Sequence, residues 1–136
     1  MTLSSEERNA IVTIRLQKAK ETLQEAKEIV TLKLWRAAAN RLYYACYYAV
    51  IALLIKNGYS PRTHSGVISL LSLHFVHTGL ICEELGKFYG NLYEIREKGD
   101  YSDWVVIKAE DVLSRLEPAE NFITEIENII NKDISP

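Results

Sequence analysis

The amino-acid sequence predicts an all-α protein, an up-and-down helical bundle of about five helices. Apolar residues recur in steps of three and four over most of the chain, which is the period of an α-helix. No stretch alternates steadily between apolar and polar residues as a half-buried strand does. Short links rich in Gly and Pro separate the apolar stretches, so consecutive helices are expected to pack side by side in one domain spanning residues 1–136.

The first two helices are expected to form the centre of the bundle. The Ser4–Ser5 pair would begin the first helix, because a serine side chain accepts hydrogen bonds from the free N–H groups of a first turn. Its stripe toward the core is Val12, Leu16, Ala19, Leu23, Ala26 and Val30. The second helix, from about Leu32 to Asn57, is apolar on all sides, which indicates a central position. Gly58 and Pro61 would end it.

A third helix is expected from Gly66 to about His77. Thr63 or Ser65 would cap its first turn, and Gly79 would end it. Its apolar positions include Val67, Leu70, Leu71, Phe75 and Val76.

The last two helices are expected to be separated by a short polar segment. The fourth runs from about Glu83 to Lys98, and Gly99 would end it. The fifth shows apolar residues in alternating steps of four and three between Val105 and Ile130. Pro118 lies within it, lacks an N–H group and would collide with the carbonyl of Ser114. We therefore expect a kink or short break there.

The composition limits the classes of function. Lys and Arg total 16 against 18 Asp and Glu, a formal charge of −2, so no overall basic field would hold nucleic acid and any RNA contact must be local. Cys46 and Cys82 are far apart in apolar surroundings, which indicates reduced thiols and a cytoplasmic protein. The N-terminus lacks the features of a secretory signal. The longest uncharged apolar run, Leu42 to Ile55, is too short to cross a membrane.

Several motifs, in order along the chain, resemble one known family. The first is Asn40-Arg41-Leu42-Tyr43-Tyr44-Ala45-Cys46-Tyr47-Tyr48-Ala49, followed by Thr63-His64-Ser65-Gly66 and then by Arg96-Glu97-Lys98-Gly99-Asp100-Tyr101. Together they resemble the HEPN domain of a small prokaryotic family, over roughly residues 10–130. The resemblance implies a helical bundle that is often a homodimer and is commonly encoded beside a minimal nucleotidyltransferase.

The resemblance also implies a type of active site. Many HEPN proteins are ribonucleases of toxin–antitoxin or antiviral systems. Those active members carry an Arg, four to six intervening residues and a His, and two copies meet across the dimer. Here Arg96 has that setting, but no His follows it through Asp103. The departure matters because His suits both proton transfers of metal-independent RNA cleavage, whereas Asp100 would be a weaker base and would repel phosphate.

The leading hypothesis is therefore a HEPN-type module that binds a nucleotide, RNA or a protein partner, as the companion of a minimal nucleotidyltransferase in a toxin–antitoxin-like pair. One alternative is a metal-independent ribonuclease with a degenerate site made from Arg96, Asp100, Tyr101 or His64. Another is a purely structural interaction domain.

Arg96 is the central candidate because a guanidinium matches the oxygens of a phosphate. We expect it at the mouth of a crevice. In the structural interpretation it interacts with the helix dipole and pairs with Asp100. Related two-gene systems attach AMP to a Tyr near the Arg–His motif, and Tyr101 is the nearest candidate. His64 either makes local hydrogen bonds or is the best remaining candidate for a general base.

Arg41, Tyr44 and Tyr48 share one face of the second helix. This face is either a cationic and aromatic patch for a nucleotide or core packing with hydroxyls at the rim. A charge in so apolar a helix needs a partner. For Arg41 the candidates are Asp100, Glu84 and Glu94.

Neither a metal nor a cofactor is expected. His74 and His77 are three residues apart on one helix, but two imidazoles alone do not make a metal site. The expected partners are a second copy of the chain, a minimal nucleotidyltransferase, and a nucleotide or RNA, with no membrane.

Overall fold

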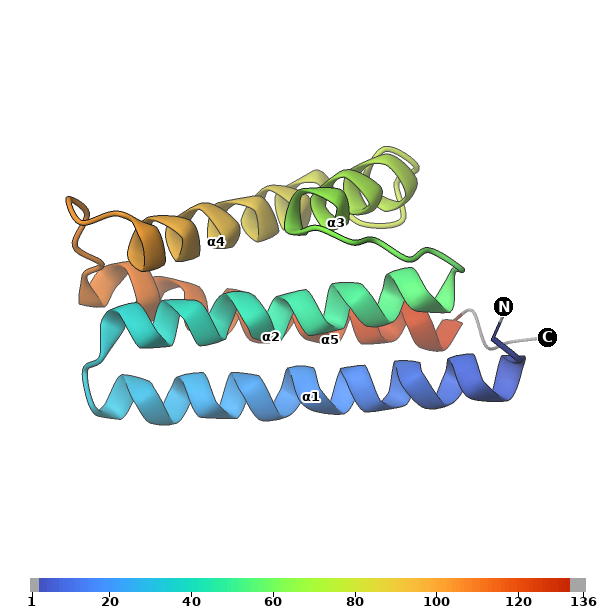
Figure 1. The fold of residues 1–136 in the computed structure, drawn as a ribbon, viewed down its shortest axis with the longest axis horizontal. Helices are drawn as coiled ribbons and strands as arrows, with labels where there is room; N and C mark the ends of the chain where they lie inside the picture. The colour runs from blue at the N-terminus through green and yellow to red at the C-terminus, as the bar shows by residue number, and fades with distance from the viewer. Residues whose placement is uncertain (1–2, 133–136) are drawn as a thin grey trace.

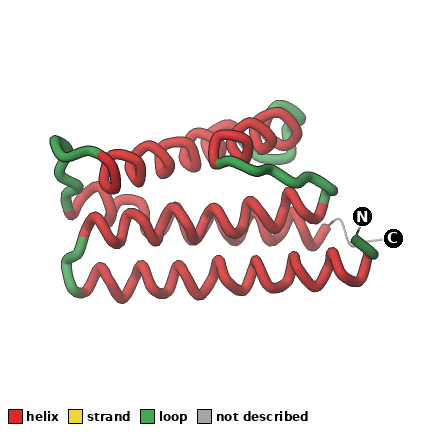
Figure 2. The backbone as a smooth tube through the Cα atoms, in the orientation of Figure 1, coloured by secondary structure: helices red, strands yellow, loops and turns green. Residues whose placement is uncertain are grey.

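Five α-helices and one turn of π-helix make up the computed structural model, which describes residues 3–132. They are α1 (Ser5–Thr31), α2 (Trp35–Lys56), α3 (His64–Leu71), η1 (Ser72–Val76), α4 (Glu83–Tyr101) and α5 (Ala109–Lys132). The long helices α1, α2, α4 and α5 run up and down along the longest axis of the molecule, and short loops join them (Figures 1 and 2). No strand occurs among residues 3–132. The all-α bundle that the sequence predicts is confirmed.

Helix α2 lies at the centre of the bundle. It packs against α1, α4, α5 and α3, and Figure 1 shows it between α1 on one side and α3 and α4 on the other. Although α2 is long and apolar enough to span a membrane, more than half of its most apolar segment is buried inside the protein. A helix that is apolar on all sides satisfies its surface in this way when other helices surround it.

Helix α1 begins as the sequence predicts. The Ser4 hydroxyl accepts a hydrogen bond from the N–H of Glu7, and the Glu7 carboxylate accepts one from the N–H of Ser4. This reciprocal arrangement satisfies two of the free donors of the first turn. The stripe from Val12 to Ala26 is buried and Val30 packs against the same core.

The third helical segment begins earlier than predicted, and its last part is a π-helix. Its α-helical part begins at His64, two residues earlier than predicted, because the Thr63 hydroxyl caps it by accepting from the N–H of Gly66. After Leu71 the chain continues as the π-helix Ser72–Val76. The earlier start makes His64 the first residue of a helix.

Gly99 does not end the fourth helix, which continues to Tyr101. A Cβ atom at Gly99 would lie 3.1 Å from Cγ1 of Ile107 and 3.3 Å from Cγ of Arg36. The glycine is therefore explained by the close approach of neighbouring side chains rather than by a change of backbone direction. Asp100 and Tyr101 consequently belong to the last turn of α4.

Of the kink or short break expected at Pro118, the break is wrong, because α5 is one helix from Ala109 to Lys132. Buried residues on both sides of the proline, Val112 and Phe122 among them, pack into the same core. That burial offsets the lost backbone hydrogen bond. Val105, expected at the start of this helix, lies before it and is exposed.

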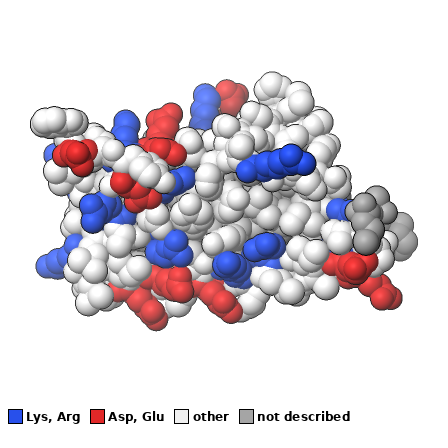
Figure 3. Space-filling model, viewed as in Figure 1, with Lys and Arg blue, Asp and Glu red and all other residues white. Residues whose placement is uncertain are grey.

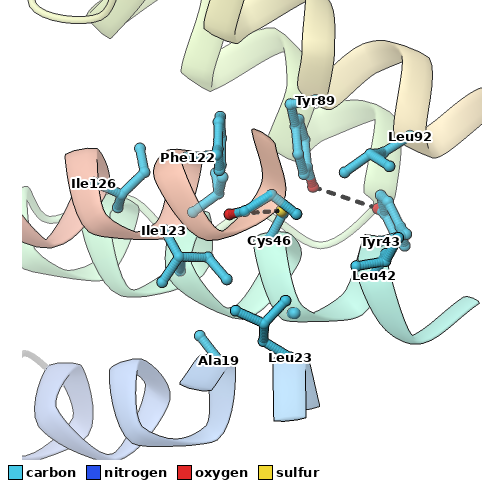
Figure 4. Packing of buried hydrophobic residues seen from close by; sticks show 14 of the residues in the cluster. Ala19, Leu23, Leu42, Tyr43, Cys46, Tyr89, Leu92, Phe122, Ile123 and Ile126 are labelled. Carbon is cyan, nitrogen blue, oxygen red and sulfur yellow. Dashed lines mark hydrogen bonds between the residues drawn. The ribbon is translucent and has the colours of Figure 1, made fainter. Parts of the chain in front are cut away.

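The two cysteines have different surroundings. Cys46 is fully buried between α1, α2 and α5, near Ala19, Leu23 and Ile123 (Figure 4), and burial raises the pKa of its thiol well above the usual range. Cys82 is exposed at the start of α4. The expectation of apolar surroundings is thus correct for the first cysteine and wrong for the second.

Candidate functional site

The side chain of Arg96 lies inside a cage of tyrosine rings. Arg96 is on α4 and is 3% exposed. The central carbon of its guanidinium lies 5.0 Å from the ring centre of Tyr43, 5.4 Å from Tyr44, 5.6 Å from Tyr93 and 5.8 Å from Tyr101. Each distance is within the range of a cation–π interaction. We call these four tyrosines the tyrosine cage.

The charge of Arg96 is only partly matched by acidic groups. Its Nη1 lies 3.8 Å from Oδ2 of Asp100, and its Nη2 lies 3.7 Å from Oε1 of Glu97. Both distances exceed a hydrogen bond, and Nε and Nη2 have no hydrogen-bond partner within residues 3–132. A buried donor without a partner costs about 1–3 kcal/mol. Arg96 therefore keeps donors that an added acceptor would satisfy.

Arg96 nevertheless remains a cation. Burial alone would lower its pKa, but the neighbouring Tyr44 and Glu97 favour the charged form and the pKa is raised overall. The faces of the four cage rings carry negative charge density, so they also favour the charged form of Arg96.

The expectation that Arg96 stands at the mouth of a crevice is wrong for the single chain. Its guanidinium lies beneath side chains, of which Tyr101 is 72% exposed. A hollow of about 650 Å³ lies at the start of α2 beside the loop after α4, and its lining does not include Arg96. Tyr101, in the last turn of α4, is the most exposed of the four cage rings.

His64 joins Arg96 at the tyrosine cage. Its imidazole centre lies 5.6 Å from the ring centre of Tyr43, 5.8 Å from Tyr44 and 6.2 Å from Tyr93. The same three rings contact Arg96. Burial, reinforced by the positive charge of Arg96, lowers the pKa of His64, with Glu97 opposing. The imidazole is therefore neutral near pH 7.

Tyr43, which sequence reasoning did not single out, links His64 to the core. Its hydroxyl lies 2.7 Å from Nδ1 of His64, and the Tyr89 hydroxyl donates to it over 3.4 Å (Figure 4). Both tyrosines are fully buried, and burial raises the pKa of Tyr43 to about 12. The available signal was the spacing of Tyr43 and Tyr47, four residues apart, which puts both on the face of α2 toward His64.

Asp100 has a second partner on α2. The side-chain amide of Asn40 donates to Oδ2 of Asp100 over 2.9 Å, the same oxygen that faces Nη1 of Arg96. Asn40 also accepts two hydrogen bonds from Arg41, at 3.1 and 2.8 Å. A continuous polar chain therefore connects the two candidate arginines.

The face formed by Arg41, Tyr44 and Tyr48 lies at the rim of the core. Arg41 stacks over Tyr44 at 5.3 Å, and Lys18 from α1 lies 4.6 Å from the ring centre of Tyr48. Both tyrosines are partly exposed and also pack against the core. The face is therefore cationic and aromatic and also packs against the core, while its binding of a nucleotide stays a prediction.

The acidic partner of Arg41 was predicted wrongly. Glu25 on α1 lies 3.7 Å from its Nη1, whereas Asp100, Glu84 and Glu94 do not pair with it in the described part of the chain. Helix α1 packs along α2, so it supplies a carboxylate that the sequence of α2 and α4 alone does not reveal. On the face drawn in Figure 3, cations and anions are interspersed and form no continuous basic field.

His74 stacks on Tyr59 with ring centres 4.6 Å apart. Residues 3–132 contain no group of three or more His, Cys, Asp or Glu side chains arranged to hold a metal ion.

Comparison with known proteins identifies the family. The model of the HEPN domain matches residues 12–129. A UPF0332 protein of Thermotoga maritima is 39% identical over 124 residues, covering 91% of this chain and 94% of that protein. A Methanocaldococcus jannaschii protein named "putative toxin" is 34% identical over 127 residues, covering 93% and 91%. A second protein of that name from the same organism is 28% identical, covering 88% and 82%. This chain belongs to the HEPN domain family.

Proposed function

We propose that this protein is a HEPN-type module that binds the phosphate of a nucleotide or RNA at Arg96. It would act in the cytoplasm, as the companion of a minimal nucleotidyltransferase in a toxin–antitoxin-like pair. The observation that carries the proposal is a buried, charged Arg96 with two nitrogens that lack hydrogen-bond partners within residues 3–132. The cage rings lie within cation–π distance of the guanidinium carbon but supply no hydrogen-bond acceptor to Nε or Nη2 in the described residues.

A phosphate fits this site better than a carboxylate side chain of the protein does. Glu97 and Asp100 already lie near the guanidinium but stay beyond hydrogen-bond distance. Phosphate oxygens match the donor fork of Arg, and such charge-assisted hydrogen bonds are strong. Access requires the exposed ring of Tyr101 to turn away, which breaks one cation–π contact.

The rest of a nucleotide would lie on the neighbouring aromatic rim, the partly exposed rings of Tyr44 and Tyr48. Tyr44 contacts both Arg96 and Arg41. One nucleotide would therefore place its phosphate at Arg96 and its base over the rim. Tyr48 and Lys18 extend this surface toward α1. Bases stack on aromatic side chains without regard to sequence, so this rim would accept a nucleotide or a short single strand.

An exposed apolar end of the bundle supports a protein partner. Leu32 and Leu34 in the link before α2 are 68% and 53% exposed, and Trp104 and Val106 in the link before α5 are 94% and 76% exposed. Exposed apolar groups gathered at one place mark interaction surfaces. The toxin names of two relatives and the buried thiol of Cys46 fit a paired, cytoplasmic protein.

The binding proposal is tested by NMR during a titration with AMP and then with a short single-stranded RNA. Amide signals around Arg96 and Tyr44 are expected to shift, while those of Glu127 and Lys20, where α1 pairs with α5 on another side of the bundle, stay in place. Shifts spread evenly over the surface would contradict a site at Arg96. Co-expression with a minimal nucleotidyltransferase should yield a stable complex, and light scattering should give the mass of a homodimer.

A metal-independent ribonuclease is the second candidate, because the structure brings His64 to Arg96. An imidazole beside a phosphate-binding cation is suited to proton transfer. Purified protein incubated with single-stranded RNA, next to its Arg96→Met and His64→Asn variants, decides between the two functions. Cleavage lost in both variants would establish the enzyme, and equal cleavage by all three proteins would identify a contaminant.

A further inference from the structure

We propose that Tyr43 is a positioning residue that holds His64 with its proton on Nε2, so that His64 donates a hydrogen bond to the phosphate held at Arg96. The position of the proton follows from the buried hydroxyl groups and does not depend on a ligand. The donation to phosphate rests on the proposed function. Two buried tyrosines would thereby fix the tautomer of a partly exposed histidine.

The buried hydroxyl protons of Tyr43 and Tyr89 have few possible acceptors. Tyr89 and Tyr43 are 0% exposed, and within residues 3–132 their hydroxyls have only each other and Nδ1 of His64 as polar partners. Each hydroxyl carries one proton that needs an acceptor. Both protons are placed when Tyr89 donates to Tyr43 and Tyr43 donates to Nδ1.

The opposite direction leaves a buried proton without an acceptor. If Nδ1 of His64 carried the proton and donated to Tyr43, then the proton of either Tyr43 or Tyr89 would point at no acceptor. Leaving a buried donor unsatisfied is costly, and this cost favours the arrangement with both protons placed by roughly 5- to 150-fold. The core therefore selects the arrangement in which Nδ1 accepts.

The hydrogen bond to Nδ1 also determines the charge state of the imidazole. Nδ1 accepts a hydrogen bond only when it is unprotonated, so His64 must be neutral. Arg96 contacts the same three rings as His64 and opposes a second positive charge there. Neutral His64 with an occupied Nδ1 carries its single proton on Nε2.

The other ring nitrogen of His64, Nε2, would be available to a ligand. His64 is partly exposed at the first turn of α3, and Nε2 has no hydrogen-bond partner in the described residues. A neutral donor beside the charged fork of Arg96 would give a phosphate one more hydrogen bond without adding charge. It also means that Nε2 has no lone pair with which to act as a general base, so the ribonuclease alternative needs another base or a different tautomer.

The experiment measures the side-chain nitrogens of His64 by ¹⁵N NMR in ligand-free protein, in wild type and in two matched variants. Tyr43→Phe removes the hydroxyl bonded to Nδ1. Tyr47→Phe removes the hydroxyl of a ring that lies closer to His64, at 4.9 Å between centres, but makes no hydrogen bond to it in the described residues. Both changes keep an aromatic ring, so both variants are expected to fold.

We expect wild type to show Nε2 protonated and Nδ1 as a hydrogen-bonded acceptor. Tyr43→Phe should shift the Nδ1 signal to that of a free acceptor and raise the titration midpoint of His64, since a bond that stabilised the neutral ring is lost. Tyr47→Phe should leave the Nδ1 signal as in wild type. Protonated Nδ1 in wild type, or the same Nδ1 signal in wild type and Tyr43→Phe, would overturn the inference.

AMP is then added to the same samples as the phosphate probe. The Nε2 proton of wild type is expected to shift on binding, and Tyr43→Phe to bind AMP several-fold more weakly than Tyr47→Phe. AMP binding that leaves the Nε2 signal unchanged would overturn the donation to phosphate. Failure of wild type to bind AMP or RNA would instead overturn the proposed function, while the ligand-free spectra still decide the position of the proton.

Discussion

Arg96 and His64, which come from different helices, contact the same three tyrosine rings, those of Tyr43, Tyr44 and Tyr93. Arg96 is a cation whose Nε and Nη2 have no hydrogen-bond partner in the described part of the chain, and His64 is a neutral ring bonded to a buried hydroxyl. Both lie at the edge of the core. Substitutions at either residue therefore allow effects on stability and effects on binding to be measured separately.

Replacing Arg96 by Met should leave stability unchanged or raise it by up to about 2 kcal/mol, because an apolar side chain of similar volume often replaces a buried, incompletely paired charge without loss. The tyrosine cage would then pack against a thioether, which contacts aromatic rings favourably. Urea unfolding followed by circular dichroism measures the change. A loss of 3 kcal/mol or more would show that Arg96 mainly holds the fold together, as the structural alternative requires.

His64 should make the stability of the protein depend on mildly acidic pH. Its pKa in the folded protein is lowered from the ordinary value of about 6.5, so at mildly acidic pH the unfolded chain binds more protons than the folded one. This contribution to stability is complete above pH about 6.5 and is lost as pH falls toward the folded pKa. The stability of wild type relative to His64→Asn should therefore decrease between pH 7.5 and 5. A constant difference over that range would contradict the lowered pKa.

Two glycines on α4 give opposite predictions for the same substitution. A Cβ at Gly86 would lie 2.9 Å from Cγ2 of Val76, a stiff side chain, whereas a Cβ at Gly90 meets nothing within 4 Å. Gly86→Ala should lower stability by about 1–2 kcal/mol, since overpacking exceeds the gain in helix propensity. Gly90→Ala should raise it by about 0.5–1 kcal/mol. Thermal unfolding of both variants compares them, and equal shifts would rule out close packing at Gly86.

Pro118→Ala should stabilise α5 by about 1–2 kcal/mol. The substitution restores an N–H donor for the carbonyl of Ser114 in a continuous helix, which outweighs the entropy that proline removes from the unfolded chain. Glu117→Ala, at the neighbouring exposed position, is the control and should change stability by no more than about 0.5 kcal/mol. Destabilisation by Pro118→Ala would mean that the helix depends on the proline.

Most of the fold could be predicted from the sequence because periodicity determines which faces are buried. The stripe from Val12 to Ala26 and the apolar character of α2 correctly identified the core and its central helix. The errors fall where tertiary packing outweighs local preference. Pro118 is held within a helix by buried residues on both sides, and Gly99 serves a close contact rather than a helix end.

The candidate site was predicted less completely, since it depends on contacts between helices. Arg96, Asp100 and His64 were identified by residue type and motif, and the structure brings them to one region. The burial of Arg96 and the role of Tyr43 depend on how α4 and α3 lie against α2. The spacing of Tyr43 and Tyr47 puts both on one face of α2, but it does not reveal which residues of other helices that face contacts.

Binding of phosphate at Arg96 is tested most directly by calorimetric titration of wild type, Arg96→Met and Lys87→Met with AMP and with a short single-stranded RNA. Lys87 lies on the same helix and is exposed, and its substitution changes the net charge equally. We expect Arg96→Met to bind at least about tenfold more weakly than wild type, as the loss of a charge-assisted hydrogen bond implies, while Lys87→Met binds as wild type does. Equal affinities for all three proteins would contradict a phosphate site at Arg96.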